Sequence, residues 1–169
     1  MVNELNNELK NRLINLTWMG EETKKKALLK NKAFTAKIGY PDEWRDYSSL
    51  ELENSSSLLN NSIKCSEFNH FYEIDRLFKP VDLNRWEMDA HTINAYFHPL
   101  KNEIVFPAGI LQPPFFDINA EDAFNYGAIG TIIGHEMTHS YDDMGRKFDH
   151  KGNLNNWWTE EDLKKFNEK

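Results

Sequence analysis

The centre of the chain reads NYGAIGTIIGHEMTHSY over residues 125–141. Side chains four positions apart lie on one face of a helix, so His135 and His139 can point both imidazoles at one metal ion. Neutral imidazole nitrogen is a ligand that zinc readily accepts. Glu136 lies next to the first histidine and is a candidate general base for a metal-activated water. This stretch therefore predicts a helix that carries a hydrolytic zinc centre.

The composition of the same stretch favours a helix that packs inside a domain. Three glycines and three isoleucines lie just before the first histidine: Gly127, Ile129, Gly130, Ile132, Ile133 and Gly134. An exposed helix does not need this composition, whereas small and apolar residues allow close packing on a sheet or on another helix. We expect one continuous helix over residues 125–141, with both imidazoles on the same face.

The third metal ligand is not evident in the sequence. A catalytic zinc site uses three protein ligands and leaves one position to water. The metzincin pattern would place a histidine six residues after His139, where this chain has Gly145. Glu160 and Glu161 lie near the spacing of a thermolysin-like ligand, but with Thr159 they are better explained as the start of a helix. Two ligands are therefore supplied, and the third stays open.

Hydrophobic spacing elsewhere predicts a mainly helical chain. Helices are expected at residues 3–16, 21–37 and 63–79. After Pro80 the pattern changes, and residues 92–97 and 103–106 favour two strands joined by a turn at 98–102. Thr159 has the position of a helix cap that opens a final helix. The predicted fold is mainly α with a small antiparallel β-sheet.

Composition narrows the class of protein. The chain has 169 residues, a formal net charge of −7 and one cysteine, Cys65. The negative charge argues against nonspecific binding of nucleic acid, and we expect no nucleic-acid partner. One cysteine forms no internal disulfide, and the polar N-terminus lacks the apolar core of a signal peptide. Nothing in the cysteine count demands an oxidising compartment.

Longer motifs occur in order along nearly the whole chain. They are TWM at 17–19, IGYP at 38–41, NAYFHP at 94–99, IVFPAGILQPPFF at 104–116, GHEMTHSYDDMGR at 134–146 and WW at 157–158. Together they resemble the neprilysin family of zinc metallopeptidases, which includes neprilysin, endothelin-converting enzyme and bacterial endopeptidase O. The resemblance implies a partial thermolysin-like (gluzincin) catalytic domain over residues 80–169. Residues 1–79 would be a helical segment of the capping and linker region that precedes it. Likeness to bacterial endopeptidase O would imply a cytoplasmic location, with a membrane-anchored or extracellular ectodomain as the alternative.

The resemblance also implies a metal and its ligands. One Zn²⁺ per catalytic site would be held by His135, His139 and a glutamate that lies beyond residue 169. Glu136 would activate the zinc-bound water that hydrolyses peptide bonds of short peptides. The rest of the catalytic domain would then be a partner of this chain. Without it, exposed hydrophobic faces predict self-association. Asp142 and Asp143 would orient the ligand imidazoles by bonding to their second ring nitrogens. Alternatively, these carboxylates are only solvated charges at the end of the helix.

Substrate-binding roles follow from the same resemblance. Asn94 and Ala95 would pair with the backbone of a bound peptide, as an exposed strand edge can do. The alternative for Asn94 is a hydrogen bond within its own turn. Four further residues would line the pocket for the residue after the cut, or else belong to the ordinary core: Ile110, Phe115, Thr131 and Ile132.

Two positions depart from the family pattern, because His98 stands where Asn or Ser is usual and Thr131 is more polar than its counterparts. The leading interpretation is part of a zinc endopeptidase, inactive in isolation. The alternative is a noncatalytic helical/β module with weak two-histidine zinc binding.

Overall fold

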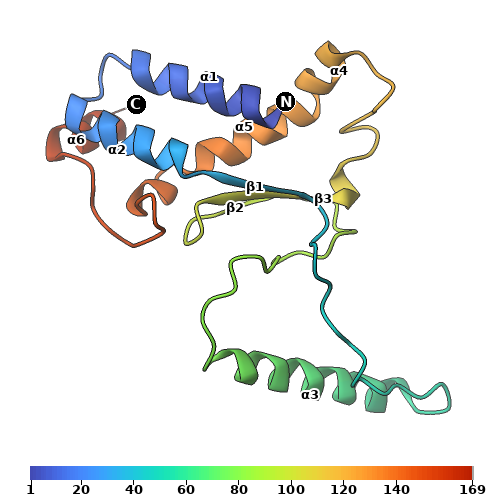
Figure 1. Ribbon diagram of the computed structural model, residues 1–169. Helices are drawn as coiled ribbons and strands as arrows, with labels where there is room; N and C mark the ends of the chain where they lie inside the picture. The colour runs from blue at the N-terminus through green and yellow to red at the C-terminus, as the bar shows by residue number, and fades with distance from the viewer. Residues whose placement is uncertain (169) are drawn as a thin grey trace. The chain divides into compact units, whose positions relative to one another are not determined.

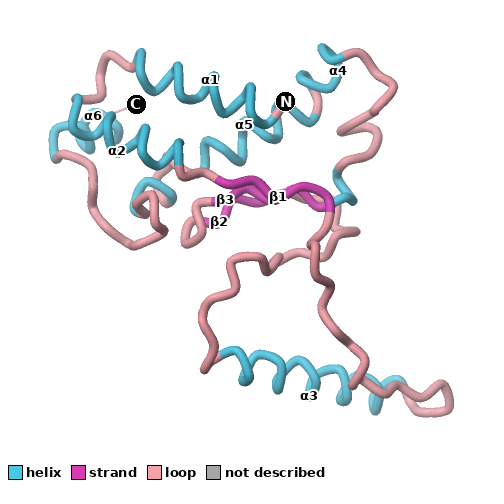
Figure 2. The backbone as a smooth tube through the Cα atoms, in the orientation of Figure 1, coloured by secondary structure: helices cyan, strands magenta, loops and turns pink. Residues whose placement is uncertain are grey.

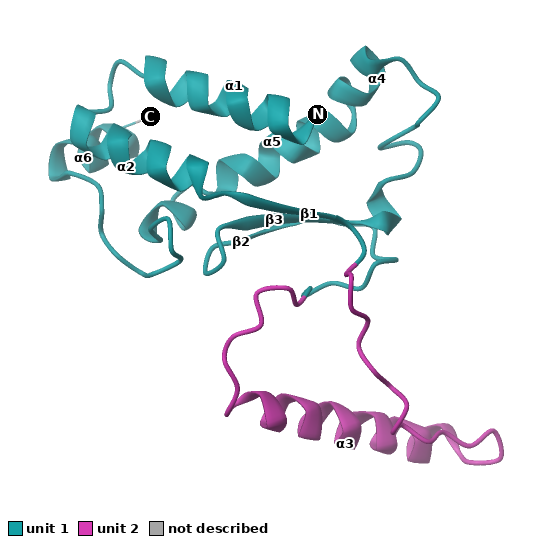
Figure 3. Cartoon of the chain, in the orientation of Figure 1, with its two compact units in different colours: residues 1–40, 86–169 teal, residues 41–85 magenta. Residues whose placement is uncertain are grey.

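The computed structural model describes residues 1–168 and divides the chain into two compact units. Unit 1 combines Met1–Tyr40 with the chain from Trp86 onward, and unit 2 is Pro41–Arg85 (Figure 3). The helices are α1 Val2–Asn15, α2 Glu21–Lys32, α3 Leu58–Arg76, α4 Asp122–Gly127, α5 Ile129–His139 and α6 Glu160–Asn167 (Figure 1). The strands are β1 Thr35–Gly39, β2 Tyr96–His98 and β3 Glu103–Pro107 (Figure 2). Short 3₁₀ helices cover 108–110 and 145–147.

The sheet is mixed, and the prediction of a purely antiparallel sheet is wrong. The strand order is β1-β3-β2, with β3 parallel to β1 and antiparallel to β2. The expected helix over 21–37 ends at Lys32, and the next residues form β1 beside β3. Because β3 is completely buried, pairing with it outweighs the helix preference of Ala33, Ala36 and Lys37.

The predicted antiparallel pair is confirmed, although its first strand is shorter than expected. Tyr96 pairs with Val105, and His98 pairs with Glu103. Residues 92–95 lie outside the strand. Within the described residues β2 has one strand neighbour, so it is an edge strand of this sheet.

The core of unit 1 places α5 between the sheet and α1. Ile129, Ile133 and Met137 recur along one side of α5 and join a buried cluster with Ile104 and Phe106 of β3. Residues of α1 pack against the same cluster: Val2, Leu5 and Leu9. A helix buried on this side turns its other residues, including the histidines, toward the opposite side.

The helix over 125–141 is not continuous, which corrects the prediction. α4 ends at Gly127, and Ala128 separates it from α5 with φ −92° and ψ −95°. Asn125 precedes the break, and its buried side chain accepts from the amide of Asp117 and donates to the Asp117 carbonyl. These bonds tie α4 to the preceding loop. Both histidines lie after the break, within α5.

A second buried cluster joins the two ends of unit 1. Leu13, Met19 and Ala27 pack with the tryptophan pair Trp157 and Trp158. The predicted helix cap that follows is confirmed, since the Thr159 hydroxyl accepts from the amide of Asp162, 3.2 Å away.

Unit 2 consists of α3 and the segments on either side of it. The helix runs over Leu58–Arg76 rather than 63–79 and buries none of its residues. Arg45 stacks on Tyr72, with 3.8 Å between the guanidinium carbon and the ring centroid.

No helix in the described residues is long and apolar enough to cross a membrane. The assignment of 1–79 to a capping region and 80–169 to a catalytic domain stays a prediction.

Candidate metal centre

The two histidines of α5 converge, as their spacing predicts. The Nε2 atoms of His135 and His139 lie 3.0 Å apart, and the rings meet edge to face with centroids 4.5 Å apart. Two nitrogens bound to one tetrahedral zinc ion at about 2.0–2.1 Å lie about 3.3 Å from each other. A small adjustment therefore lets both nitrogens hold one ion.

Glu136 completes the cluster. One ligand atom from each of His135, Glu136 and His139 lies within 4.8 Å of the others, the single such group among residues 1–168. Glu136 is buried, with 7% of its surface exposed. Burial raises the pKa of this carboxyl, whereas charge on His139 and His135 and a hydrogen bond from the Phe97 backbone act in the opposite direction. A carboxylate with a raised pKa is better matched to proton transfer near neutrality.

Asp142 contacts the second nitrogen of a histidine. Its Oδ2 lies 2.7 Å from Nδ1 of His139, and its Oδ1 accepts from the amides of Met144 at 3.0 Å and Gly145 at 2.7 Å. Burial opposes ionisation, but these amide bonds and the bond to His139 outweigh it and lower the pKa of Asp142. An Nδ1–H bond to a carboxylate leaves Nε2 free for a metal. Asp143 is exposed, and its predicted role stays untested.

The loop after α5 folds back on the helix end at a position that requires glycine. A Cβ atom at Gly145 would lie 1.8 Å from the backbone oxygen of His139. The close approach brings the Gly145 amide to Asp142. Close packing therefore explains why position 145, where a metzincin would have a histidine ligand, is a glycine.

The residues predicted to bind peptide backbone lie just before β2. Ala95 is buried in the core cluster, and Asn94 is exposed. The side-chain oxygen of Asn94 accepts from the Ala95 amide at 2.9 Å, which is the local bond that the sequence left as the alternative. The substrate role of both residues stays a prediction.

The four residues predicted to line a substrate pocket are only partly gathered. Ile110 is buried in the core cluster, and the half-buried Phe115 and Ile132 pack against it. Thr131 is exposed and donates its hydroxyl to the carbonyl of Gly127 at 2.8 Å. Their pocket role also stays a prediction.

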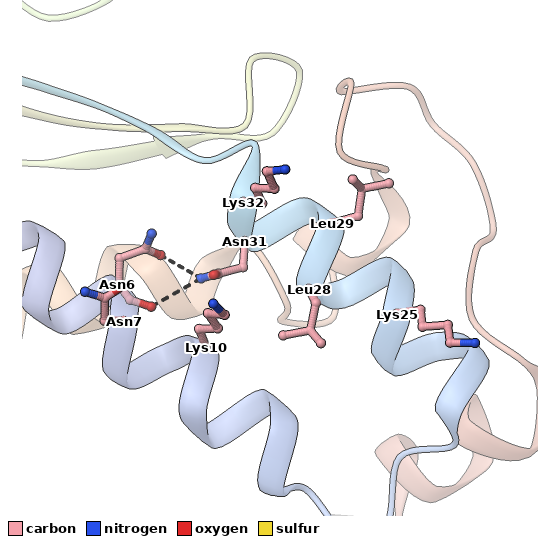
Figure 4. A pocket seen from close by; sticks show the side chains of 8 residues that line it. All are labelled: Asn6, Asn7, Lys10, Lys25, Leu28, Leu29, Asn31 and Lys32. Carbon is pink, nitrogen blue, oxygen red and sulfur yellow. Dashed lines mark hydrogen bonds between the residues drawn. The ribbon is translucent and has the colours of Figure 1, made fainter.

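A groove of about 470 Å³ lies elsewhere, between α1 and α2 (Figure 4). Its lining includes Lys10, Lys25 and Leu28, and Asn31 bridges the helices by donating to Asn6 at 2.6 Å. It contains no histidine or carboxylate. The chemistry belongs to the α5 cluster rather than to this groove.

Sequence reasoning missed Lys30, whose side chain is buried beside the end of α5. The one available signal was its position in α2, since Thr23, Ala27 and Lys30 share one helix face. That face is buried at all three positions.

Comparison with known proteins agrees with the geometry. Residues 94–169 and residues 1–41 match peptidase family M13. The chain belongs to this family. Neprilysin-3 of Drosophila melanogaster is 42% identical over 177 aligned residues, covering 100% of this chain and 22% of that protein. A neutral endopeptidase of Lactobacillus helveticus is 41% identical over 170 residues, covering 100% of this chain and 26% of that protein.

Solved structures of related proteins are similar to the chain over nearly its whole length. A zinc metalloprotease of Mycobacterium tuberculosis in complex with an inhibitor has a TM-score of 0.95 and 47% identity, covering 99% of this chain and 25% of that one. PepO from a Lactobacillus has a TM-score of 0.93 and 39% identity, covering 99% of this chain and 27% of that one. The chain thus spans about a quarter of the length of these relatives. Family membership and the α5 cluster together support a metal cofactor.

Proposed function

We propose that this chain forms part of the active site of a zinc-dependent endopeptidase with a thermolysin-like catalytic domain. One observation carries the proposal: Nε2 of His135 and Nε2 of His139 lie 3.0 Å apart, with the buried Glu136 in the same cluster, in a chain of family M13. The M13 relatives include proteins that are named neutral endopeptidase and zinc metalloprotease. Zinc suits the two imidazoles, and a third ligand would complete its site.

Each residue of the cluster has a distinct task in the proposed reaction. When bound, zinc would polarise the scissile carbonyl and lower the pKa of a water. His135 and His139 would hold the ion through Nε2. Glu136 would accept a proton from the water as the water oxygen bonds to the carbonyl carbon, and would pass that proton to the amine nitrogen as the C–N bond breaks. Asp142 keeps the proton of His139 on Nδ1, so the nitrogen that faces the ion stays free.

The place of β2 at the edge of the sheet supports an extended peptide as substrate. A strand edge offers backbone N–H and C=O groups to an added chain, and Ala95 leads directly into this edge. Phe97 of the same strand contacts Glu136 through its backbone. A peptide along β2 would therefore run close to the catalytic carboxylate. Self-association and a cytoplasmic location stay predictions, which sedimentation and cell fractionation test.

The test of this proposal is a peptidase assay with a quenched peptide that has a large apolar residue after the cut. The protein assayed joins this chain to the rest of an M13 catalytic domain. Glu136→Gln keeps the shape of the side chain but cannot take the proton, so we expect activity to fall by about 10²–10⁴-fold. Zinc content should be unchanged, and a chelator should abolish the wild-type activity. Near-normal turnover of a zinc-loaded Glu136→Gln variant would remove Glu136 from the mechanism.

The isolated chain provides a second arm of the same test. Glu136 is assigned to proton transfer, so the cluster leaves two histidines as metal ligands, and we expect no measurable cleavage. Chelator-sensitive cleavage by residues 1–169 alone would mean that a ligand inside this chain has been missed. Zinc binding without activity in the longer protein would favour the noncatalytic two-histidine module.

A further inference from the structure

A buried lysine of α2 holds the loop that follows α5. Lys30 exposes 1% of its surface. Its Nζ donates to three backbone carbonyls: Ser140 at 2.8 Å, Gly145 at 2.8 Å and Phe148 at 2.7 Å. An ammonium group has three donors, and here one lysine uses all three on one short loop.

The surroundings of Lys30 favour a charged group that stays in place. Its Nζ lies 5.8 Å from the ring centroids of Phe97 and Tyr141, within reach of a cation–π interaction. Burial lowers the pKa of Lys30 to about 8, although the nearby carboxylates of Asp149 and Asp142 act in the other direction. At neutral pH the side chain is therefore still protonated and can make all three bonds.

The loop that Lys30 binds, residues 140–148, also carries Asp142, which contacts a candidate metal ligand. Ser140 ends α5 directly after His139, and its carbonyl is one of the groups that a helix end leaves without a partner in the helix. Gly145 gives its carbonyl to Lys30 and its amide to Asp142. Asp142 in turn contacts Nδ1 of His139. An unbroken series of hydrogen bonds thus connects α2 to a candidate metal ligand.

We propose that Lys30 is a positioning residue of the metal centre. By gathering the carbonyls of residues 140, 145 and 148, it fixes the loop in the shape that places Asp142 against His139. Its Nζ bonds to backbone carbonyls, and it acts on His139 through Asp142. The inference deepens the proposed function and rests on it for the identity of the metal.

The first experiment needs no metal. Backbone amide hydrogen exchange is measured at Met144 and Gly145, whose N–H groups donate to Asp142. In Lys30→Met the stem keeps its volume but all three bonds are lost, so exchange at both amides should accelerate by about 10- to 100-fold. The matched control is Lys25→Met, an exposed lysine of the same helix that lines the groove in Figure 4. It should leave both rates unchanged.

The second experiment measures zinc affinity by competition with a chromogenic chelator, in chains whose fold is verified by circular dichroism. Loss of an outer residue that orients a ligand typically costs about 10- to 100-fold in metal affinity, and we expect this loss for Lys30→Met and none for Lys25→Met. If Lys30 acts through Asp142, it should have little further effect in an Asp142→Asn background. Additive losses in the double variant would overturn the proposal.

The remaining outcomes are also decisive. Unchanged amide exchange and unchanged zinc affinity in Lys30→Met would reject the positioning role. If Lys30→Met does not fold, Lys30→Arg replaces it, because a guanidinium keeps the charge but cannot converge on three carbonyls in the same way. If neither variant folds, Lys30 acts in folding and the proposal is rejected. If His135→Ala binds zinc as tightly as wild type, the proposed metal site is rejected. Amide exchange would still decide the role of Lys30.

Discussion

The two units of the chain differ in how they use their apolar residues. Unit 1 buries two clusters, one centred on Ile104 and Met137 and the other on the two adjacent tryptophans. Unit 2 has a longer helix, α3, yet it buries none of its residues. Phe71 and Phe78 expose 68% and 89% of their surfaces. The metal cluster lies in the unit that has a core.

The difference shows what holds the metal centre in shape. The α5 helix is fixed by contacts with residues far away in the sequence, from α1, α2 and β3. α3 depends on local features, such as its cap at Ser57 and ion pairs between side chains on its surface. Changes in unit 1 should therefore affect stability and the site together, whereas changes in unit 2 should stay local.

The largest effect should come from the core under the histidines. Met137 is 1% exposed, and Met137→Ala should lower the free energy of unfolding of unit 1 by about 2–5 kcal/mol. The matched change in unit 2, Phe71→Ala, should stay within about 0.5 kcal/mol because the ring is exposed. Denaturant unfolding followed by tryptophan fluorescence measures both. Equal losses would mean that Phe71 is buried in solution.

A smaller loss is expected where the loop folds back on α5. Gly145→Ala places a Cβ atom 1.8 Å from the His139 backbone oxygen, so the loop must move at a cost of about 1–3 kcal/mol. Gly134→Ala is the control, since a Cβ there meets nothing within 4 Å. It should be neutral or slightly stabilising, because alanine favours a helix. Thermal unfolding distinguishes them, and a harmless Gly145→Ala would contradict the close approach.

Asp162→Asn should lower the free energy of unfolding by about 1 kcal/mol at neutral pH, because a charged carboxylate accepts stronger hydrogen bonds than a neutral amide. Burial opposes ionisation, but hydrogen bonds from Thr23, Gly20 and Thr159 outweigh it and lower the pKa of Asp162. A carboxyl whose folded pKa lies below its unfolded value of about 3.9 adds stability above that pH and loses it as the pH falls. Asp162→Asn should therefore be less stable than wild type at pH 7, with a gap that closes below about pH 4. A stability difference between wild type and Asp162→Asn that widens in acid would contradict the lowered pKa of Asp162.

The smallest effect on the metal site should come from α3. Ser57→Ala removes the side-chain cap that accepts from the Asn60 amide at 3.2 Å, which should weaken this helix by about 0.5–2 kcal/mol. Because α3 belongs to unit 2, zinc affinity should not change. Loss of helicity is read by circular dichroism and zinc affinity by chelator competition. A parallel loss of zinc binding would show that the units are coupled.

Local patterns explain what the sequence predicts well. The histidine pair follows from i,i+4 spacing, and the cap at Thr159 follows from a four-residue pattern. The antiparallel pairing of β2 with β3 follows from two β-favouring runs separated by a short turn. Each of these features is decided by residues that are close together in the sequence.

The features that sequence reasoning misses depend on distant contacts. β1 looks like the end of a helix until Thr35–Gly39 pairs with Glu103–Pro107. The break at Ala128 follows α4, which the bonds of Asn125 to Asp117 tie to the preceding loop. Lys30 looks like one of several surface lysines, because the carbonyls that bury it lie more than 100 residues away in the sequence. Tertiary contacts override local preference in each case.

The most direct test of the central claim is X-ray absorption at the zinc edge, on zinc-loaded wild type and on His139→Ala. If His135 and His139 are the ligands, the wild-type spectrum should show two imidazole nitrogens at about 2.0–2.1 Å. The variant should lose one of them and bind zinc more weakly. An identical spectrum and affinity in His139→Ala would place the metal elsewhere and contradict the account.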